Sequence, residues 1–165
     1  MVYGSKQVGE NRYREDVGRY FEDFKVGDIY EHRPGRTISE ADNTWFTLLT
    51  LNTNQVHFNA EYAAKTEWGK TLVNSGLTVA IVLGQSVTDT SQNAIANLGW
   101  DEVRFPAPVL HGDTIRVESE VKELRDSKSR PQNGIVVFEH RAYNQRDELV
   151  AICKRSGLML RKPKS

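Results

Sequence analysis

One polar stretch gathers side chains that could bind and activate a small molecule. Residues 50–59 read Thr-Leu-Asn-Thr-Asn-Gln-Val-His-Phe-Asn, so that His57 follows Asn52 by five residues and Asn54 by three. An imidazole can accept a proton from water near neutral pH, and a carboxamide can hold that water by hydrogen bonds. The same residue types also cap helix ends in a turn between two helices. The stretch alone therefore leaves a catalytic site and a structural turn as open alternatives.

The other histidines and the single cysteine indicate structural positions. His111 stands with a Gly-Asp pair just before an alternating segment, which is typical of a turn that opens a strand. His32 and His140 have polar or alternating surroundings, and we expect them at the surface. Cys153 follows apolar residues in an expected strand, which predicts a buried and unreactive thiol.

Patterns typical of bound metals and nucleotides are absent from the sequence. It contains no His-x-x-x-His, no Gly-x-Gly-x-x-Gly and no phosphate-loop pattern. One cysteine excludes an intrachain disulfide and a Cys-based zinc site. We therefore expect no metal, nicotinamide, flavin or nucleoside triphosphate, and hence no separate cofactor.

Helical patterns flank the polar stretch and follow it. Ser39 with Asp42 forms a capping pattern ahead of apolar residues at helical spacing. Asn59 is placed to cap a second, short helix that Gly69 could end. Residues 76–89 are apolar nearly all round, and a length of about 14 residues favours a buried helix over a buried strand.

The second half of the chain has the period of strands. Residues 115–121 alternate between apolar and charged side chains, residues 134–144 and 149–160 return as further strands, and residues 94–105 form one more. Short turns between consecutive strands imply antiparallel pairing. The sequence therefore predicts an α+β domain in which one buried helix packs on a mostly antiparallel sheet.

Length and charge limit the number of domains and the class of partner. The 165 residues suit a single domain, which we place at residues 20–161, with a flexible N-terminal arm at 1–19 and a basic tail at 162–165. Lys and Arg number 22 and Asp and Glu also number 22, which argues against binding to nucleic acid or to a membrane surface. Without a long apolar run or a signal-peptide pattern, the expected location is the cytoplasm.

The polar stretch resembles the hydratase motif of the MaoC-like dehydratases, which belong to the hotdog-fold superfamily. That motif reads Ser/Thr-Gly-Asp-x-Asn-Pro-x-His and then Ala, and this chain matches it at Thr50, Asn54, His57 and Ala63. The resemblance runs in order over about residues 20–161, and the ordered set is specific although each piece is weak. The further matching stretches are Phe21–Asp28 (the family's opening strand), Trp68-Gly69, Leu72-Val73 and Phe105–Thr114.

The resemblance implies a hotdog fold, a long central helix wrapped by a curved antiparallel sheet. It implies an enzyme that adds or removes water across the 2,3-bond of an enoyl-CoA thioester, with coenzyme A entering as part of the substrate. His57 and Asn52 would be the catalytic pair that holds the water. Asn54 and a backbone N–H of Ser75 or Gly76, where the long helix begins, would bind the substrate and polarise its carbonyl. Because the family's site is a cleft between two units, we expect a homodimer or a higher homo-oligomer.

The chain departs from the family motif in three places. Leu51-Asn52 replaces Gly-Asp, Gln55 replaces Pro, and Asn74-Ser75 replaces the His-Gly ahead of the long helix. A carboxamide cannot accept a proton at neutral pH, so His57 would be the only base of the motif. The change is similar to a MaoC-like subgroup that acts on short branched dicarboxylic esters such as mesaconyl-CoA.

Two other functions stay open at the level of sequence. The first is a hotdog-fold acyl-CoA thioesterase, because one fold hosts both activities. The only acid of the predicted long helix is Asp89, at its far end, which counts against that function. The second is a non-catalytic acyl-thioester-binding protein, which the Asn52 substitution keeps open.

Overall fold

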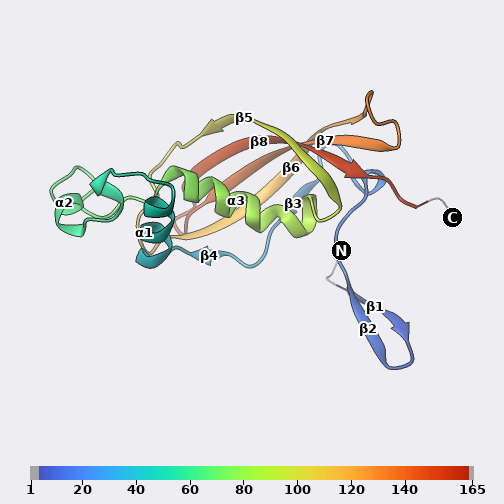
Figure 1. Cartoon of the computed structure of the whole chain (residues 1–165), viewed down its shortest axis with the longest axis horizontal. Coiled ribbons are helices and arrows are strands. Elements are labelled where there is room, and N and C mark those ends of the chain that lie inside the picture. Colours follow the sequence, from blue (N-terminus) through green and yellow to red (C-terminus); the bar gives the residue numbers. More distant parts are fainter. Residues whose placement is uncertain (1–3, 164–165) are drawn as a thin grey trace.

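The computed structural model describes residues 4–163, and its centre is a long helix, α3 (Ser75–Thr90), lying across a six-stranded antiparallel sheet (Figure 1). The strands follow the order β3-β6-β7-β8-β5, and β4 also pairs with β6. Their bounds are β3 (Ile29–Glu31), β4 (Arg36–Thr37), β5 (Ala94–Arg104), β6 (Thr114–Asp126), β7 (Asn133–Tyr143) and β8 (Leu149–Leu160). The predicted α+β class, with one helix on an antiparallel sheet, is confirmed.

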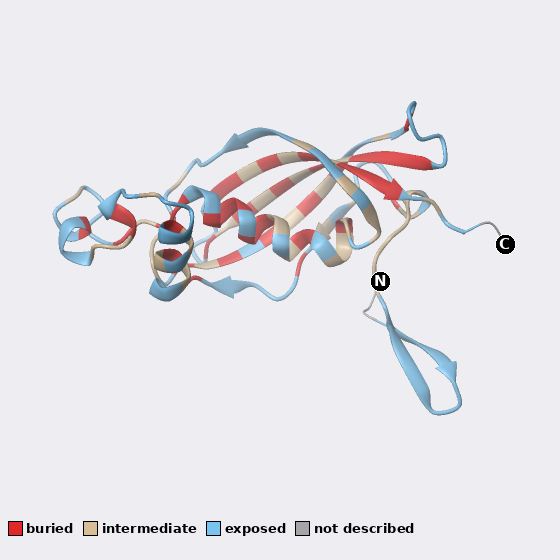
Figure 2. Cartoon of the chain, viewed as in Figure 1, coloured by how far each residue is buried: buried red, intermediate tan, exposed pale blue. Residues whose placement is uncertain are grey.

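The alternating pattern of the sequence reflects strands that have one face against α3, as β6, β7 and β8 do. Buried and less buried residues alternate along β6, β7 and β8 (Figure 2). A cluster of apolar side chains fills the space between the sheet and the first half of α3, where Leu77, Ile81 and Val82 meet Val117 and Ala151. The buried side of α3 is apolar for this reason, whereas Gly76, Ala80 and Gly84 are exposed on its other side.

Three short elements lie beside the N-terminal end of α3: α1 (Glu40–Leu49), η2 (Gln55–His57) and α2 (Ala60–Ala64) (Figure 1). The predicted capping box of α1 is present, because the Ser39 hydroxyl accepts from the Asp42 N–H and the Asp42 carboxylate accepts from the Ser39 N–H. Asn59 caps α2 as expected. Helix α2 ends at Ala64, so Gly69 does not end it and instead adopts a positive φ in a later turn.

The N-terminal segment, for which the sequence predicts a flexible arm at residues 1–19, contains a hairpin that the sequence does not predict. Strands β1 (Gly4–Gly9) and β2 (Arg12–Asp16) pair with each other, and every residue in them is exposed (Figures 1 and 2). A hairpin with no buried face shows no apolar period, which is why the pattern of the sequence does not reveal it. Residues 1–3 of the arm and 164–165 of the tail lie outside the described residues.

The stretch 21–28, which resembles an opening strand, is also different in the structure. It begins as a 3-10 helix, η1 (Phe21–Asp23), because the Asp23 carboxylate accepts the Tyr20 N–H and holds the turn. Gly27, at φ +91°, then reverses the chain into β3, which starts only at Ile29. Among the described residues, no helix has the length and apolar character needed to cross a membrane.

His32 and His140 are buried, so the expectation that they lie at the surface is wrong. They belong to a chain of polar contacts under the C-terminal end of α3. The Asp89 carboxylate lies 3.0 Å from His32 Nδ1, and the Ser119 hydroxyl lies 2.6 Å from both His32 Nε2 and His140 Nδ1. His140 lies on the inner face of β7 together with Phe138 and Ala142, which are two residues before and after it. This period of two residues was visible in the sequence.

Candidate functional site

The polar stretch starts where α1 ends. The Leu51 N–H donates to the Leu48 carbonyl and the Asn52 N–H donates to the Thr47 carbonyl, which is the Schellman pattern of a helix C-terminus. Its left-handed position is Leu51, at φ +58°. This is the position at which the hydratase motif has Gly, so the backbone here follows the glycine geometry although the side chain does not.

Asn52 and Asn54 shape the turn that follows. The Asn52 side-chain oxygen accepts the Asn54 N–H at 3.0 Å, and the Asn54 side-chain oxygen accepts the Val56 N–H at 3.3 Å. The second bond caps η2, whose last residue is His57. Both carboxamides therefore have the structural role that the turn interpretation assigns to them. The Asn52 oxygen keeps a second lone pair, and its NH2 group has no acceptor among the described residues.

The His57 ring is fixed in one tautomer. Its Nδ1–H donates to the Leu72 carbonyl oxygen at 2.9 Å, and a carbonyl can only accept. The neutral ring therefore carries its lone pair on Nε2, which has no hydrogen-bond partner in residues 4–163. The Leu72 N–H in turn donates to the Val56 carbonyl at 3.1 Å. These two bonds hold the imidazole against Leu72, which lies three residues before the start of α3.

Asn43 of α1 joins the polar turn to the start of α3. It is fully buried, and its Nδ2 donates to the carbonyl oxygens of His57 at 2.7 Å and Leu72 at 3.0 Å. Its Oδ1 accepts the Asn74 N–H at 2.8 Å. Asn43 was not among the predicted site residues, because 14 to 68 residues separate it from its partners. A carboxamide on the inner face of an amphipathic helix was the available signal.

His111 also lies at this junction. Its Nε2 is 2.8 Å from Asn43 Nδ2, which can only donate, so the contact needs a lone pair on Nε2. Nδ2 has two hydrogens for three acceptors, so two of the three share one N–H. Burial lowers the pKa of His111, which is consistent with a neutral ring. The expected turn is confirmed for the neighbouring Asp113, whose carboxylate accepts the Leu110 N–H at 2.9 Å.

The N-terminus of α3 presents the two candidate backbone donors differently. The Asn74 side chain caps the helix by accepting the Gly76 N–H at 2.9 Å, so that N–H is already occupied. The Ser75 N–H has no acceptor among the described residues and lies in the first turn of a 16-residue helix. The helix dipole is positive at that end. A Cβ at Gly76 would meet the Phe46 ring at 3.2 Å, so glycine also permits close packing here.

Two hollows meet at Ser75. The larger has a volume of about 530 Å³ and is lined by Phe46, Ser75, Gly76, Val79, Ala80, Trp100, Val103 and Phe105. The smaller has a volume of about 240 Å³, and Ser75, Leu72 and Phe105 are in its lining. Ser75 therefore lies between an apolar hollow and a second one that borders the Leu72 segment, which holds His57.

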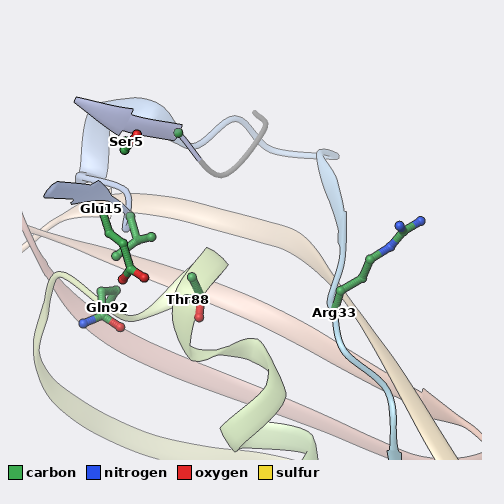
Figure 3. A pocket seen from close by; sticks show the side chains of 7 residues that line it. Ser5, Glu15, Arg33, Thr88 and Gln92 are labelled. Carbon is green, nitrogen blue, oxygen red and sulfur yellow. The ribbon is translucent and has the colours of Figure 1, made fainter. Parts of the chain in front are cut away.

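A third hollow lies at the opposite end of α3. It has a volume of about 600 Å³ and is bordered by Glu15 of the hairpin and by Thr88 and Gln92, while Arg33 extends away from it (Figure 3). None of the predicted site residues lines it. In residues 4–163, no group of three or more His, Cys, Asp or Glu side chains is arranged to hold a metal ion.

Comparison with known proteins identifies the relatives of this chain. The family model described as mesaconyl-CoA hydratase matches residues 6–164. The chain is similar to the mesaconyl-CoA hydratase of Cereibacter sphaeroides, with 33% identity over 83% of this chain and 40% of that protein. It is also similar to the beta-methylmalyl-CoA dehydratase of Chloroflexus aurantiacus, with 37% identity over 83% of this chain and 39% of that protein. The chain thus spans about two fifths of the length of these curated relatives.

A solved structure shows the same fold. A Mycobacterium tuberculosis protein described as having a double hotdog fold superposes with a TM-score of 0.82 at 25% identity, covering 90% of this chain and 46% of that one. The expected hotdog fold is therefore confirmed.

Proposed function

The chain belongs to the mesaconyl-CoA hydratase family of MaoC-like hotdog proteins, and on that premise we propose that it adds or removes water across the 2,3-bond of an enoyl-CoA thioester. In the direction of hydration, water attacks C3 while its proton passes to His57 Nε2. The same proton is then delivered to C2, so that one C–O bond and one C–H bond form. Negative charge develops on the thioester oxygen during the attack, and the Ser75 N–H at the positive end of α3 stabilises it.

The observation that carries this proposal is the orientation of His57. A base must present a lone pair to the water, and the Leu72 carbonyl fixes the ring so that Nε2 presents it. Asn52 has hydrogen-bonding groups left to orient the water, and Asn54 shapes the turn that holds both residues. The N–H of Gly76 is bound to the Asn74 side chain, so it is not free to bind the substrate carbonyl. Gly76 instead forms part of the wall of the larger hollow.

The substrate class we propose is a short branched dicarboxylic acyl-CoA such as mesaconyl-CoA. Relatives at 33% and 37% identity are named for mesaconyl-CoA hydration and beta-methylmalyl-CoA dehydration. A neutral Asn52 in place of the family's Asp is consistent with an acyl group that brings its own negative charge, because a second carboxylate would repel it.

The thioesterase alternative is not favoured by the arrangement of α3. Its only acid, Asp89, lies at the end remote from Ser75 and is bound to Arg19 at 2.8 Å and to His32 at 3.0 Å. A carboxylate held in this way has no access to a thioester at the helix N-terminus.

A direct test is to incubate the purified chain with crotonyl-CoA and with mesaconyl-CoA. We expect loss of the enoyl absorbance without release of free thiol, because hydration leaves the thioester intact. Release of thiol would indicate hydrolysis, and no reaction with either ester would leave only binding; both results contradict the proposal. The step transfers a proton and a hydroxyl and no electrons, so we propose that it needs no cofactor, and dialysis against EDTA should leave the rate unchanged.

We further propose that the working unit is a homodimer. Strand β5 is an edge of the sheet and exposes Ile95, Leu98 and Trp100, and Val87 of α3 is also exposed. The chain matches 46% of a double-hotdog protein, as one of two units would. Sedimentation should give twice the 18.8 kDa of one chain, and a stable monomer at micromolar concentration would contradict this.

A further inference from the structure

Ser75 carries a side chain at a position where the hydratase motif of the family has Gly. The His-Gly pair that precedes the long helix in that motif is Asn74-Ser75 in this chain. A glycine at the start of a helix presents only its backbone N–H to a ligand, whereas a serine presents an N–H and a hydroxyl. The chain therefore has one more hydrogen-bond donor than the motif at the residue whose N–H acts in the proposed reaction.

The Ser75 hydroxyl is free to contact a ligand. The residue is exposed at the first position of α3, and neither its Oγ nor its N–H has a hydrogen-bond partner in residues 4–163. The polar side chains on either side of it are occupied. The Asn74 carboxamide accepts the Gly76 N–H at 2.9 Å, and the Thr78 hydroxyl donates to the Asn74 carbonyl at 3.4 Å.

The surroundings of Ser75 require that neutral donors stabilise any negative charge that develops there. Ser75 is in the lining of both the larger and the smaller hollow, and every side chain in these two linings is uncharged. A thioester oxygen at this point meets no cation from these linings, so hydrogen bonds and the helix dipole have to act in its place. The Gly76 N–H cannot serve as the second donor, because the Asn74 side chain already accepts it.

We propose that the Ser75 hydroxyl donates a second hydrogen bond to the thioester oxygen, beside the bond from the Ser75 N–H. This inference rests on the proposed function and adds one catalytic group to it. The two donors are joined through Cα and Cβ of one residue, so both can reach a single acceptor atom. When water attacks C3, the electron pair of the C2–C3 double bond moves toward the thioester oxygen, and both hydrogen bonds strengthen. The serine keeps its proton throughout.

The kinetic test compares Ser75→Ala with Thr78→Val on crotonyl-CoA and mesaconyl-CoA. Ser75→Ala removes the hydroxyl and keeps the backbone N–H. Thr78→Val is the matched control, because it removes a hydroxyl of the same helix and the same smaller hollow that is already bound to a carbonyl. In Ser75→Ala, kcat should fall by about 10²-fold on both esters, the usual cost of one donor to an oxyanion. KM in Ser75→Ala and kcat in Thr78→Val should stay within about threefold of wild type.

The carbonyl stretch of bound crotonyl-CoA gives a second measurement that does not depend on turnover. In a His57→Ala background the bound ester stays unreacted, and infrared spectroscopy reports how strongly its carbonyl is polarised. Adding Ser75→Ala to this background should move the stretch to higher frequency, because the oxygen loses one donor. Circular dichroism checks that the variants fold, and we expect Ser75→Ala to fold because alanine favours a helix more than serine does.

The possible results separate the inference from the proposed function. A loss confined to mesaconyl-CoA would place the hydroxyl on the free carboxylate of the acyl group. An unchanged kcat with an unchanged carbonyl stretch would show that it contacts no part of the thioester, and an equal loss in Thr78→Val would indicate a disturbed helix. Each of these results overturns the inference while the proposed function stands. A wild-type chain that hydrates neither ester overturns the proposed function and the inference with it.

Discussion

His57 has a defined chemical role because a single hydrogen bond selects its tautomer. The Leu72 carbonyl takes the Nδ1 proton, so the lone pair of the neutral ring is on Nε2. A ring free to adopt either tautomer would carry its lone pair on Nε2 only part of the time. In the proposed reaction this residue supplies the base, and the backbone of a segment 15 residues away orients it.

Replacing His57 by Ala removes this base. We expect the hydration rate to fall by about 10²- to 10⁴-fold, the usual contribution of a general base. The fold should survive, because the imidazole lies in a turn outside the apolar clusters. Circular dichroism checks the fold, and a variant with near wild-type hydration would show that His57 is not the base.

Asn52 can be tested by restoring the acid of the wider family. In Asn52→Asp, a carboxylate oxygen can still accept the Asn54 N–H, so the turn should persist. The new charge favours the protonated form of a nearby imidazole and repels a substrate that is itself anionic. We expect lower kcat/KM on mesaconyl-CoA with unchanged or higher kcat/KM on crotonyl-CoA. A gain on both esters would mean that Asn52 is an impaired acid/base position and not an adapted one.

At the level of elements, the end of α1 carries local strain. Leu51 is at φ +58° and is 87% exposed, so its side chain gains little from packing while the backbone is in the region that favours Gly. Leu51→Gly should raise the free energy of unfolding by up to about 1 kcal/mol. Leu51→Ala is the control, because it retains a Cβ and should give no gain. Urea denaturation of both variants measures the difference, and equal stabilities would contradict the assignment of strain to the Cβ.

Asn43 couples α1, the polar turn and α3. Asn43→Ala leaves the His57 and Leu72 carbonyls and the Asn74 N–H without this partner, which should cost at least about 2 kcal/mol of stability. We also expect kcat to fall, since the site loses its alignment without losing a group that touches substrate. Asn59→Ala is the control: it removes the cap of α2, should cost about 1 kcal/mol, and should leave kcat unchanged.

For the whole molecule, the buried polar chain under α3 links stability to pH. Burial lowers the pKa of His140 from 6.5 to about 3. Between these two values the unfolded chain binds a proton that the folded chain excludes, so the free energy of unfolding falls as pH falls from 6.5 toward 3. The stabilisation is fully present above pH 6.5.

His140→Gln should weaken this acid sensitivity. Glutamine can still donate to the Ser119 hydroxyl but cannot gain a proton. The difference in unfolding free energy between wild type and variant should therefore shrink as the pH is lowered from 7 to 5 in urea titrations. His32, whose pKa is also lowered by burial, should leave part of the slope in place. Parallel curves for the two proteins would show that His140 does not contribute.

The sequence by itself determined the main elements of the domain and the family. A period of two residues placed β7 and β8 within one residue of their observed bounds but only the first part of β6, because a strand has one buried face. The length of an apolar segment placed α3. The order and spacing of the motif from Thr50 to His57 identified the family. The exposed N-terminal hairpin escaped detection because no burial imposes a pattern on it.

Only the tertiary structure decided how the site residues act. The tautomer of His57, the junction at Asn43 and the occupied N–H of Gly76 each depend on which atoms meet. Most of these contacts join segments that are far apart in the chain: 15 residues separate His57 from Leu72, and 68 separate Asn43 from His111. Local spacing records which face of an element is buried, whereas hydrogen bonds and ion pairs between elements are set by the packing that brings those faces together.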